Sequence, residues 1–383
     1  MSEASTSDRT GRGERALLAH LENAGFGRIE PPVLQPADVF LDQAGEDIRG
    51  RLYLTSDAAG REFCLRPEYT IPVCRAYLAS ADAGRPAAFS YLGPVFRFRP
   101  DASGEFQQAG LESFGRTDIE AADAEILTLA LEAAEAAGGP ALEVRIGDAG
   151  LFARVLEALD LPAAWLRRIR RGYMQGRSLE AILAAGTSGN GGLDHSGVLA
   201  ALENTDRAGA RALVQDLLSI AGISSVGGRS VGEIAERFLE QAALKAGEGL
   251  SPEHRDVLAR FLEIGGHPDA ASSALRALAT DAKLDLSAAL DRFDARLNFI
   301  AARGLDLGRL AFATRFGRNL DYYTGFVFEA HDPSRPNERP LIGGGRYDRL
   351  MRTLGAAADI PAIGAAIWCE RLFGGETRTG ASA

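Results

Sequence analysis

The stretch from Phe89 to Phe114 constrains the fold more than any other part of the chain. In the run Val95 to Arg99, arginines alternate with phenylalanines. In the run Gln108 to Glu112, the polar Gln108 and Glu112 and the small Gly110 alternate with Ala109 and Leu111. A period of two places alternate side chains on opposite faces of a β-strand. Gly93-Pro94 and the segment 101–104 supply turn residues. The stretch therefore predicts two adjacent, antiparallel strands that present arginines, a glutamine and a glutamate to one surface.

Other segments supply helices and further strands. Helical spacing predicts a helix over 13–24, and a match to a capping box at Thr117–Glu120 predicts a second that runs to about 137. A hairpin is expected over 51–70, and strands are expected at 142–146, 309–314 and 322–330. Because strand runs and helices do not alternate regularly, we expect an α+β fold with an antiparallel sheet flanked by helices. A doubly wound parallel sheet is disfavoured.

The composition changes between about 150 and 305, where Ala, Leu, Arg and Glu dominate and β-branched runs are few. This segment predicts a helical insertion domain. The expected organisation is a disordered tail over 1–12, a discontinuous core over 13–150 and 306–373, a helical insertion over 151–305, and a disordered tail over 374–383.

Charge and cysteine content limit the class of protein. The 383 residues carry a net charge of −10, which is weak evidence against a nucleic-acid partner. The odd and scattered Cys64, Cys74 and Cys369 argue against a disulfide framework and against a zinc site. We find no secretory signal and no apolar run long enough for a membrane span, so the cytoplasm is the expected compartment and no metal is expected.

Several segments together resemble the catalytic core of class II aminoacyl-tRNA synthetases, specifically histidyl-tRNA synthetase. They occur in the family's order and cover both ends of the predicted core. The segments are LRPEYT (65–70), YLGPVFRFRP (91–100), EFQQAGLESFG (105–115), GRNLDYYTGFVFE (317–329), GGGRYDRL (343–350) and PAIGAAIWCERL (361–372). The resemblance implies the class II antiparallel sheet, in agreement with the periodicity.

The resemblance also implies a pocket for a histidine-like ligand. The matching positions are Glu68, Thr70, Gln108, Glu112, Arg318 and Tyr323. Carboxylates and amides suit the N–H groups of histidine, and an arginine suits its carboxylate. Glu68 and Thr70 share a face if that segment is extended, whereas Arg318 and Tyr323 reach one pocket only if a turn lies between them. Taken singly, each residue has an ordinary alternative, as a solvated strand carboxylate or a core aromatic.

The nucleotide and tRNA sides depart from the synthetase pattern. Arg97 and Arg371 match the arginines of motifs 2 and 3, and we interpret them as a relic nucleotide site. The loop RPDASGEF is short, however, and Trp368 stands where the family has a glycine, so the indole is expected to fill that space. Tyr69 stands where the family prefers glycine. Few residues follow Arg371, so no anticodon-binding domain is expected.

A histidyl-tRNA synthetase-like core of this kind is similar to the regulatory subunits of short-form ATP phosphoribosyltransferase. That resemblance implies a non-catalytic chain without cofactors or catalytic residues. It also implies a separate catalytic subunit that depends on the chain, in the first step of L-histidine biosynthesis, and a part in feedback by free L-histidine. A homodimer through the motif 1 region near Pro32, within a hetero-oligomer, is expected, and tRNA binding is not. Two alternatives stay open: a truncated synthetase-like enzyme that activates histidine or another amino acid, and an RNA- or protein-binding sensor.

Overall fold

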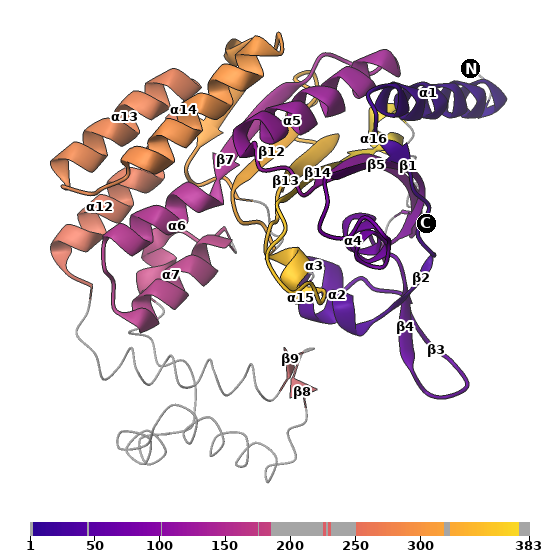
Figure 1. The fold of residues 1–383 in the computed structure, drawn as a ribbon, viewed down its shortest axis with the longest axis horizontal. Helices are drawn as coiled ribbons and strands as arrows, with labels where there is room; N and C mark the ends of the chain where they lie inside the picture. The colour runs from indigo at the N-terminus through magenta and orange to yellow at the C-terminus, as the bar shows by residue number, and fades with distance from the viewer. Residues whose placement is uncertain are drawn as a thin grey trace, which may run out of the picture. The chain divides into compact units, whose positions relative to one another are not determined.

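The computed structural model describes residues 3–43, 46–100, 102–174, 176–184, 225–226, 229–230, 250–317 and 322–374 (Figure 1). The chain separates into two compact units. The larger unit comprises residues 1–155 and 261–383, and the smaller unit comprises residues 156–260. The two units are described separately.

A nine-stranded sheet forms the centre of the larger unit. Its strand order is β1-β5-β6-β14-β13-β12-β7-β11-β10. The pairs β1–β5 and β7–β11 are parallel, and the other six are antiparallel. The strands are β1 (Gly27–Arg28), β5 (Ala87–Phe96), β6 (Glu105–Phe114), β7 (Glu143–Asp148), β10 (Gly265–Gly266), β11 (Leu310–Ala313), β12 (Phe326–His331), β13 (Ile342–Arg346) and β14 (Ala362–Trp368). The predicted α+β class with a mainly antiparallel sheet is confirmed.

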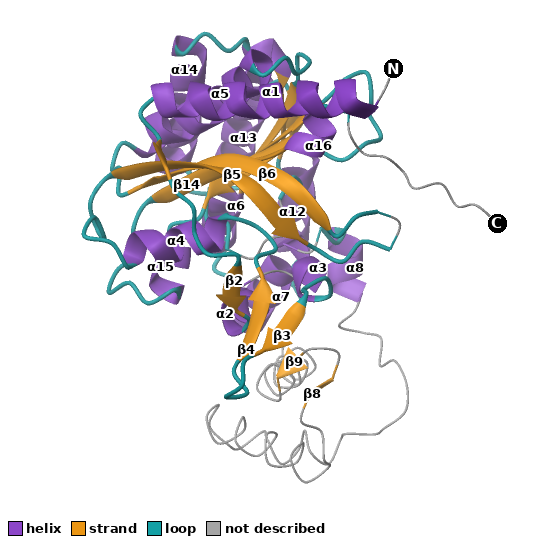
Figure 2. Cartoon of the chain, turned by 90° about the vertical axis from the view of Figure 1, so that its right-hand side faces the viewer, coloured by secondary structure: helices purple, strands orange, loops and turns teal. Residues whose placement is uncertain are grey.

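Helices cover both faces of this sheet (Figure 2). Helices α1 and α5 lie on one face, while α4 and α15 lie on the other. The helices assigned to this unit are α1 (Glu3–Asn23), α2 (Asp38–Gln43), α3 (Glu46–Arg49), α4 (Thr70–Leu78), α5 (Ile119–Ala136), α13 (Pro268–Asp281), α14 (Ser287–Ala302), α15 (Leu350–Thr353) and α16 (Cys369–Leu372), with a 3-10 turn at Leu307–Arg309. None of the helices in the described ranges is long and apolar enough to cross a membrane.

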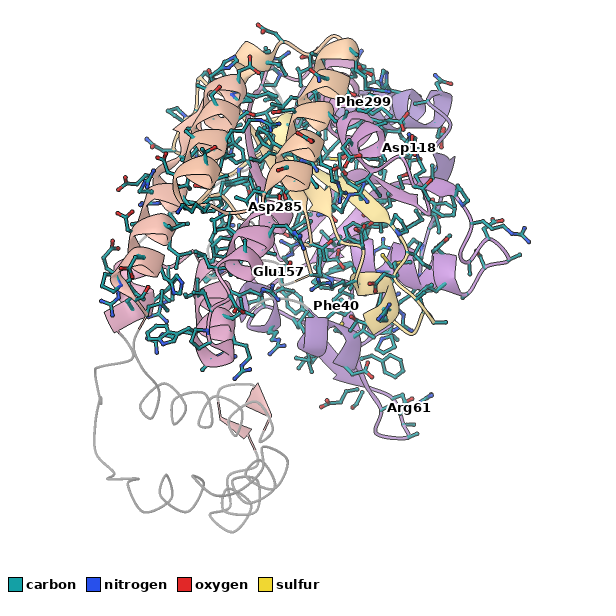
Figure 3. All side chains as sticks on the ribbon, turned by 60° about the vertical axis from the view of Figure 1, so that its left-hand side comes forward. Phe40, Arg61, Asp118, Glu157, Asp285 and Phe299 are labelled. Carbon is teal, nitrogen blue, oxygen red and sulfur yellow. The ribbon has the colours of Figure 1, made fainter. Side chains whose placement is uncertain are left out.

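A small three-stranded sheet lies apart from the large one, in the order β2-β4-β3. Strand β2 is Leu34–Pro36, and β3 (Leu54–Ser56) and β4 (Glu62–Leu65) form the hairpin predicted over 51–70. Figure 3 shows Arg61 at the tip of this hairpin. The smaller unit contains α7 (Ala163–Met174), α8 (Leu179–Ala184) and the strand pair β8 (Ser225–Val226) and β9 (Arg229–Ser230). The unit boundaries fall within α6 (Ala149–Ala158) and α12 (Pro252–Glu263).

Helix α1 begins earlier than the sequence predicted. Residues 3–12, expected to form a disordered tail, continue the helix toward the N-terminus. The end of the helix agrees with the expectation, because Gly25 adopts a φ of 94°, a left-handed conformation that glycine accepts readily. The predicted tail over 374–383 lies almost wholly outside the described residues, which end at Gly374.

The structure also differs from the sequence-based predictions at one domain boundary and at the start of one helix. Residues 261–305, expected within the insertion, lie with the larger unit, because β10 pairs with β11 and α14 packs against α5. Alanine- and leucine-rich helices look alike in sequence whichever unit they pack on. The capping box predicted at Thr117–Glu120 does not form at the start of α5. Asp118 is the N-cap without a side-chain capping bond, and its carboxylate binds Arg116 instead.

Candidate ligand-binding site

A cavity of about 190 Å³ lies in the larger unit, over the centre of the sheet. Its floor consists of Gly343 on β13 and Gly364, Ala365 and Ala366 on β14, whose small side chains leave space above the strands. Gln108 of β6 and Glu329 of β12 form opposite walls. The cavity is smaller than the 300–1,000 Å³ typical of drug-sized ligand sites, so it suits a small ligand. The lining residues are Ile48, Glu68, Thr70, Arg97, Gln108, Tyr322, Tyr323, Glu329, Tyr347, Trp368 and the four floor residues.

Glu68 and Thr70 line this cavity at the start of helix α4. The extended conformation that the sequence predicted for this segment was wrong. The carboxylate of Glu68 accepts hydrogen bonds from the backbone N–H groups of Thr70 (2.6 Å) and Ile71 (2.9 Å). These groups belong to the first turn of α4, where backbone N–H groups lack partners within the helix. Pro72 fits the same turn because it has no N–H to satisfy. Glu68 therefore both fixes the start of α4 and borders the cavity.

Gln108 lies at the wall of the cavity, as the alternation in β6 predicted. It is almost fully buried, and its Oε1 accepts a hydrogen bond from the backbone N–H of Tyr69 at 3.2 Å. That bond fixes the orientation of the amide, so the NH₂ end is the one available to a ligand. Tyr323 also lines the cavity. Arg318 lies outside the described residues.

Glu112 is completely buried behind the cavity lining. Its Oε1 accepts a hydrogen bond from the hydroxyl of Thr70 (2.8 Å) and a longer one from Tyr91 (3.4 Å). Its Oε2 accepts a short hydrogen bond from the hydroxyl of Tyr347. Thr70 and Tyr347 both line the cavity. Glu112 thus reaches the cavity through these two hydroxyls and sets their orientation.

Burial makes the acids of this site harder to ionise. It raises the pKa of Glu112 from the ordinary value of 4.5 to about 8, because hydrogen bonds from Tyr347 and Thr70 offset only part of the lost hydration. Burial also raises the pKa of Glu68, against the opposing effects of the α4 N–H groups and of Arg97. The pKa of Tyr347 is raised well above its usual value by burial and by the nearby Glu112. At neutral pH the Glu112 carboxyl is therefore mainly protonated.

Gly364 allows the Glu112 carboxyl to lie against β14. These two residues are paired in the sheet, and a Cβ atom at position 364 would stand 1.5 Å from Glu112 Oε2. No side chain larger than hydrogen fits without moving the carboxyl. Glycine is thus required by a close approach between strands.

The two arginines that were interpreted as a relic nucleotide site, Arg97 and Arg371, donate hydrogen bonds to the chain itself. Arg97 donates from Nε to the carbonyl oxygen of Pro67 (2.7 Å), and Arg371 donates to the carbonyl oxygen of Pro340 (2.7 Å). Arg99, beyond the end of β5, pairs with Glu370 at 3.3 Å. Arg97 lines the cavity, whereas Arg371 is not among the lining residues.

Trp368 lines the cavity and is itself almost fully buried. The indole is 6% exposed, and the Arg371 guanidinium lies 4.7 Å from its ring centroid. Tyr69 is likewise buried, stacked on Tyr91 with ring centroids 4.4 Å apart and covered by Arg66 at 4.1 Å. Both large residues pack into the fold at positions where the synthetase pattern has glycine.

Three of the lining residues that carry polar groups were missed in the sequence analysis, namely Tyr322, Glu329 and Tyr347. Tyr347 lies within the GGGRYDRL segment, directly after β13, so its position after a glycine-rich strand was an available signal. Glu329 faces the cavity because it pairs with Gly343 in the sheet register. Nothing in the local sequence distinguishes it from a solvated strand carboxylate.

Metal binding finds no support in the described part of the chain. There, no group of three or more His, Cys, Asp or Glu side chains is placed to hold a metal ion. Cys64, Cys74 and Cys369 are buried and free.

The chain has the fold of histidyl-tRNA synthetase-like proteins of class II. A crystal structure of an "ATP phosphoribosyltransferase regulatory subunit/histidyl-tRNA synthetase" from Bacillus halodurans aligns over 97% of this chain and 80% of its own, with a TM-score of 0.66 and 20% identity. A histidyl-tRNA synthetase from a Nostoc species aligns over 97% of this chain and 70% of its own, with a TM-score of 0.60 and 18% identity. The histidyl-tRNA synthetase family model matches residues 4–226 and 207–372.

Curated relatives narrow this class to one family. A protein of Brucella canis named "ATP phosphoribosyltransferase regulatory subunit" is 43% identical over 360 residues, which cover 93% of this chain and 95% of the relative. A relative of the same name from Brucella melitensis is also 43% identical over 360 residues, covering 93% and 94% of the two chains. The chain belongs to the family of ATP phosphoribosyltransferase regulatory subunits, as the sequence motifs predicted.

Proposed function

We propose that this chain binds free L-histidine in the cavity above β13 and β14 and conveys that signal to a separate catalytic subunit of ATP phosphoribosyltransferase. The catalytic subunit depends on the chain for activity in the first step of L-histidine biosynthesis, which we place in the cytoplasm. The observation that carries the proposal is an asymmetric site. One part of its lining has buried, hydrogen-bonded polar groups that suit an amino acid, and the buried Trp368 indole stands where we propose that the nucleotide side has been lost.

The cavity offers matched partners for histidine. Carboxyl and hydroxyl groups at Glu68, Thr70 and Tyr347 suit the ammonium and imidazole N–H groups, and the Gln108 amide adds a donor. Arg318 is proposed to bind the carboxylate, as the family resemblance implied. Tyr323 closes the same pocket, and Arg97 and Arg371 remain as relics of a nucleotide site.

Isothermal titration calorimetry on a variant of the buried Glu112 tests whether histidine binds in this cavity. Glu112→Ala removes the acceptor that holds Thr70 and Tyr347, and histidine binding should weaken by about 1.5–3 kcal/mol. Glu105→Ala is the matched control, since it lies on the same strand with an exposed side chain. Equal affinity in both variants would contradict this placement of histidine.

Measuring complex formation tests whether the catalytic subunit is the partner of this chain. The purified chain, mixed with the catalytic subunit of the same organism, is expected to sediment as one larger species in analytical ultracentrifugation. Two unshifted species over the whole accessible concentration range would rule out the proposed regulatory assembly.

We further propose that two copies of the chain pair through the motif 1 region near Pro32. Two large apolar side chains next to each other there are exposed, Val33 at 37% and Leu34 at 48%. Neighbouring exposed apolar residues commonly mark protein contacts. The double variant Val33→Glu, Leu34→Glu should sediment as a monomer, and an unchanged dimer would refute this interface.

A further inference from the structure

A second, larger cavity lies at the surface of the larger unit, on the side of α4 and α15. It is a groove of about 960 Å³ between the C-terminal end of α4 and the segment 353–360 that follows α15. Figure 2 shows both helices on the same face of the sheet. Nearly half of its lining residues are alanine or glycine, including Ala79, Gly84 and the run from Gly355 to Ala358. Such a lining lets another main chain approach closely.

Arg75 is the charged group of this groove that lacks a carboxylate partner among the side chains that the structure describes. Neither of the two acids that line the groove is paired with Arg75 among the described side chains. Asp359 pairs with Arg352 at 2.9 Å, and Asp38 accepts a hydrogen bond from the backbone N–H of Val39 at 2.8 Å. A guanidinium in a concave site is best satisfied by a carboxylate, which it can bind through two parallel hydrogen bonds.

Both walls of the groove are continuous with the candidate histidine site. Helix α4 begins with Thr70, which binds Glu112, and brings Arg75 and Leu78 to the groove. The other wall begins after Tyr347, which also binds Glu112. Its segment is held at both ends, because Tyr347 N–H donates to Ala362 O (2.8 Å) and Ala362 N–H donates to Asp348 (2.9 Å). A movement of Thr70 and Tyr347, the two residues that bind Glu112, would therefore displace both walls of the groove.

We propose that this groove receives an acidic segment of the catalytic subunit, with an Asp or Glu side chain bound to Arg75; the proposal rests on the regulatory function proposed above. The shape disfavours a second copy of this chain as the occupant. In a twofold interface a groove on the symmetry axis faces an identical groove, and neither groove fills the other. The occupant is thus a convex segment of a different surface, and the unpaired cation specifies its charge.

The test compares two charge reversals in the full chain. Arg75→Glu should raise the dissociation constant for the catalytic subunit by about tenfold or more, the loss expected for a charge-assisted hydrogen bond turned into repulsion. Lys283→Glu is the matched control, because Lys283 is exposed between α13 and α14, away from the groove. Its dissociation constant should equal that of the wild type. Circular dichroism of both variants checks that the fold is kept.

The remaining outcomes are also decisive. Equal binding of Arg75→Glu and Lys283→Glu would overturn the groove proposal while leaving the regulatory function intact. Loss of self-association in Arg75→Glu, with partner binding unchanged, would assign the groove to a second copy and would also overturn it. Failure of the wild-type chain to bind the catalytic subunit would refute the proposed function itself.

Discussion

The buried carboxyl of Glu112 should leave a distinct mark on how stability depends on pH. In the unfolded chain this group ionises near its ordinary pKa of 4.5, whereas in the folded chain burial raises the pKa to about 8. Between these values the folded chain keeps a proton that the unfolded chain has lost. The free energy of unfolding therefore falls as pH rises, by up to about 1.4 kcal/mol per pH unit.

The perturbation is Glu112→Gln, which keeps the shape of the protonated acid and cannot ionise. The stabilising contribution of Glu112 is complete below its unfolded pKa and is lost as pH rises through its folded pKa. From pH 5 to pH 8 the wild type should lose roughly 4 kcal/mol that the variant keeps. The variant should consequently be the more stable protein at pH 9.

Urea denaturation followed by circular dichroism at pH 5, 7 and 9 measures this difference directly. Glu105→Gln is the control, because its side chain is exposed on the same strand and the variant should follow the wild type. A constant difference between wild type and Glu112→Gln across this pH range would refute the reasoning. It would mean that the carboxyl is hydrated or ionised in the folded state.

Three further predictions concern packing around the site. Trp368→Gly should open the filled nucleotide side, and a fluorescent ATP analogue should then bind more tightly than to the wild type; unchanged binding would show that the indole does not block the site. Gly364→Ala should displace the carboxyl of Glu112 and weaken histidine binding in calorimetry, because the new Cβ overlaps Oε2; intact affinity would disprove that close approach. Asp123→Ala leaves Arg296 and Arg346 buried without their shared carboxylate, and should cost about 3–5 kcal/mol in urea denaturation, whereas Glu120→Ala on the same helix should cost about 1 kcal/mol or less; equal losses would contradict the burial argument.

Local periodicity predicted the two adjacent strands β5 and β6, but the first one was misplaced. Strand β5 ends at Phe96, so Arg97 and Arg99 lie beyond it, and Gly93-Pro94, expected as a turn, lie within it. The alternation in β6 predicted that Gln108 and Glu112 share one face of the strand. In the structure Gln108 lines the cavity, and Glu112 lies behind the lining on the same face. The short connection between Phe96 and Glu105 joins the two strands, which pair antiparallel as expected. This part of the fold required no knowledge of distant contacts.

The role of Glu68 and the ionisation of Glu112 could not be predicted in this way. Glu68 caps α4, and the helix start depends on how the chain enters the core, which the expected extended segment did not capture. The raised pKa of Glu112 depends on burial and on Tyr347, which lies 235 residues away in the chain. Such long-range contacts carry no signal in a single sequence. The same holds for α14, whose pairing with α5 through Arg296 and Asp123 only the folded chain reveals.

The central claim is that this chain controls a separate phosphoribosyltransferase in response to histidine. The most direct measurement is the initial rate of ATP phosphoribosylation by the catalytic subunit as this chain is titrated in, with and without L-histidine. We predict that the rate rises with the chain until the complex is saturated, and that histidine then lowers it. A catalytic rate that does not respond to the chain, together with histidine-dependent ATP–pyrophosphate exchange by the chain alone, would contradict the claim.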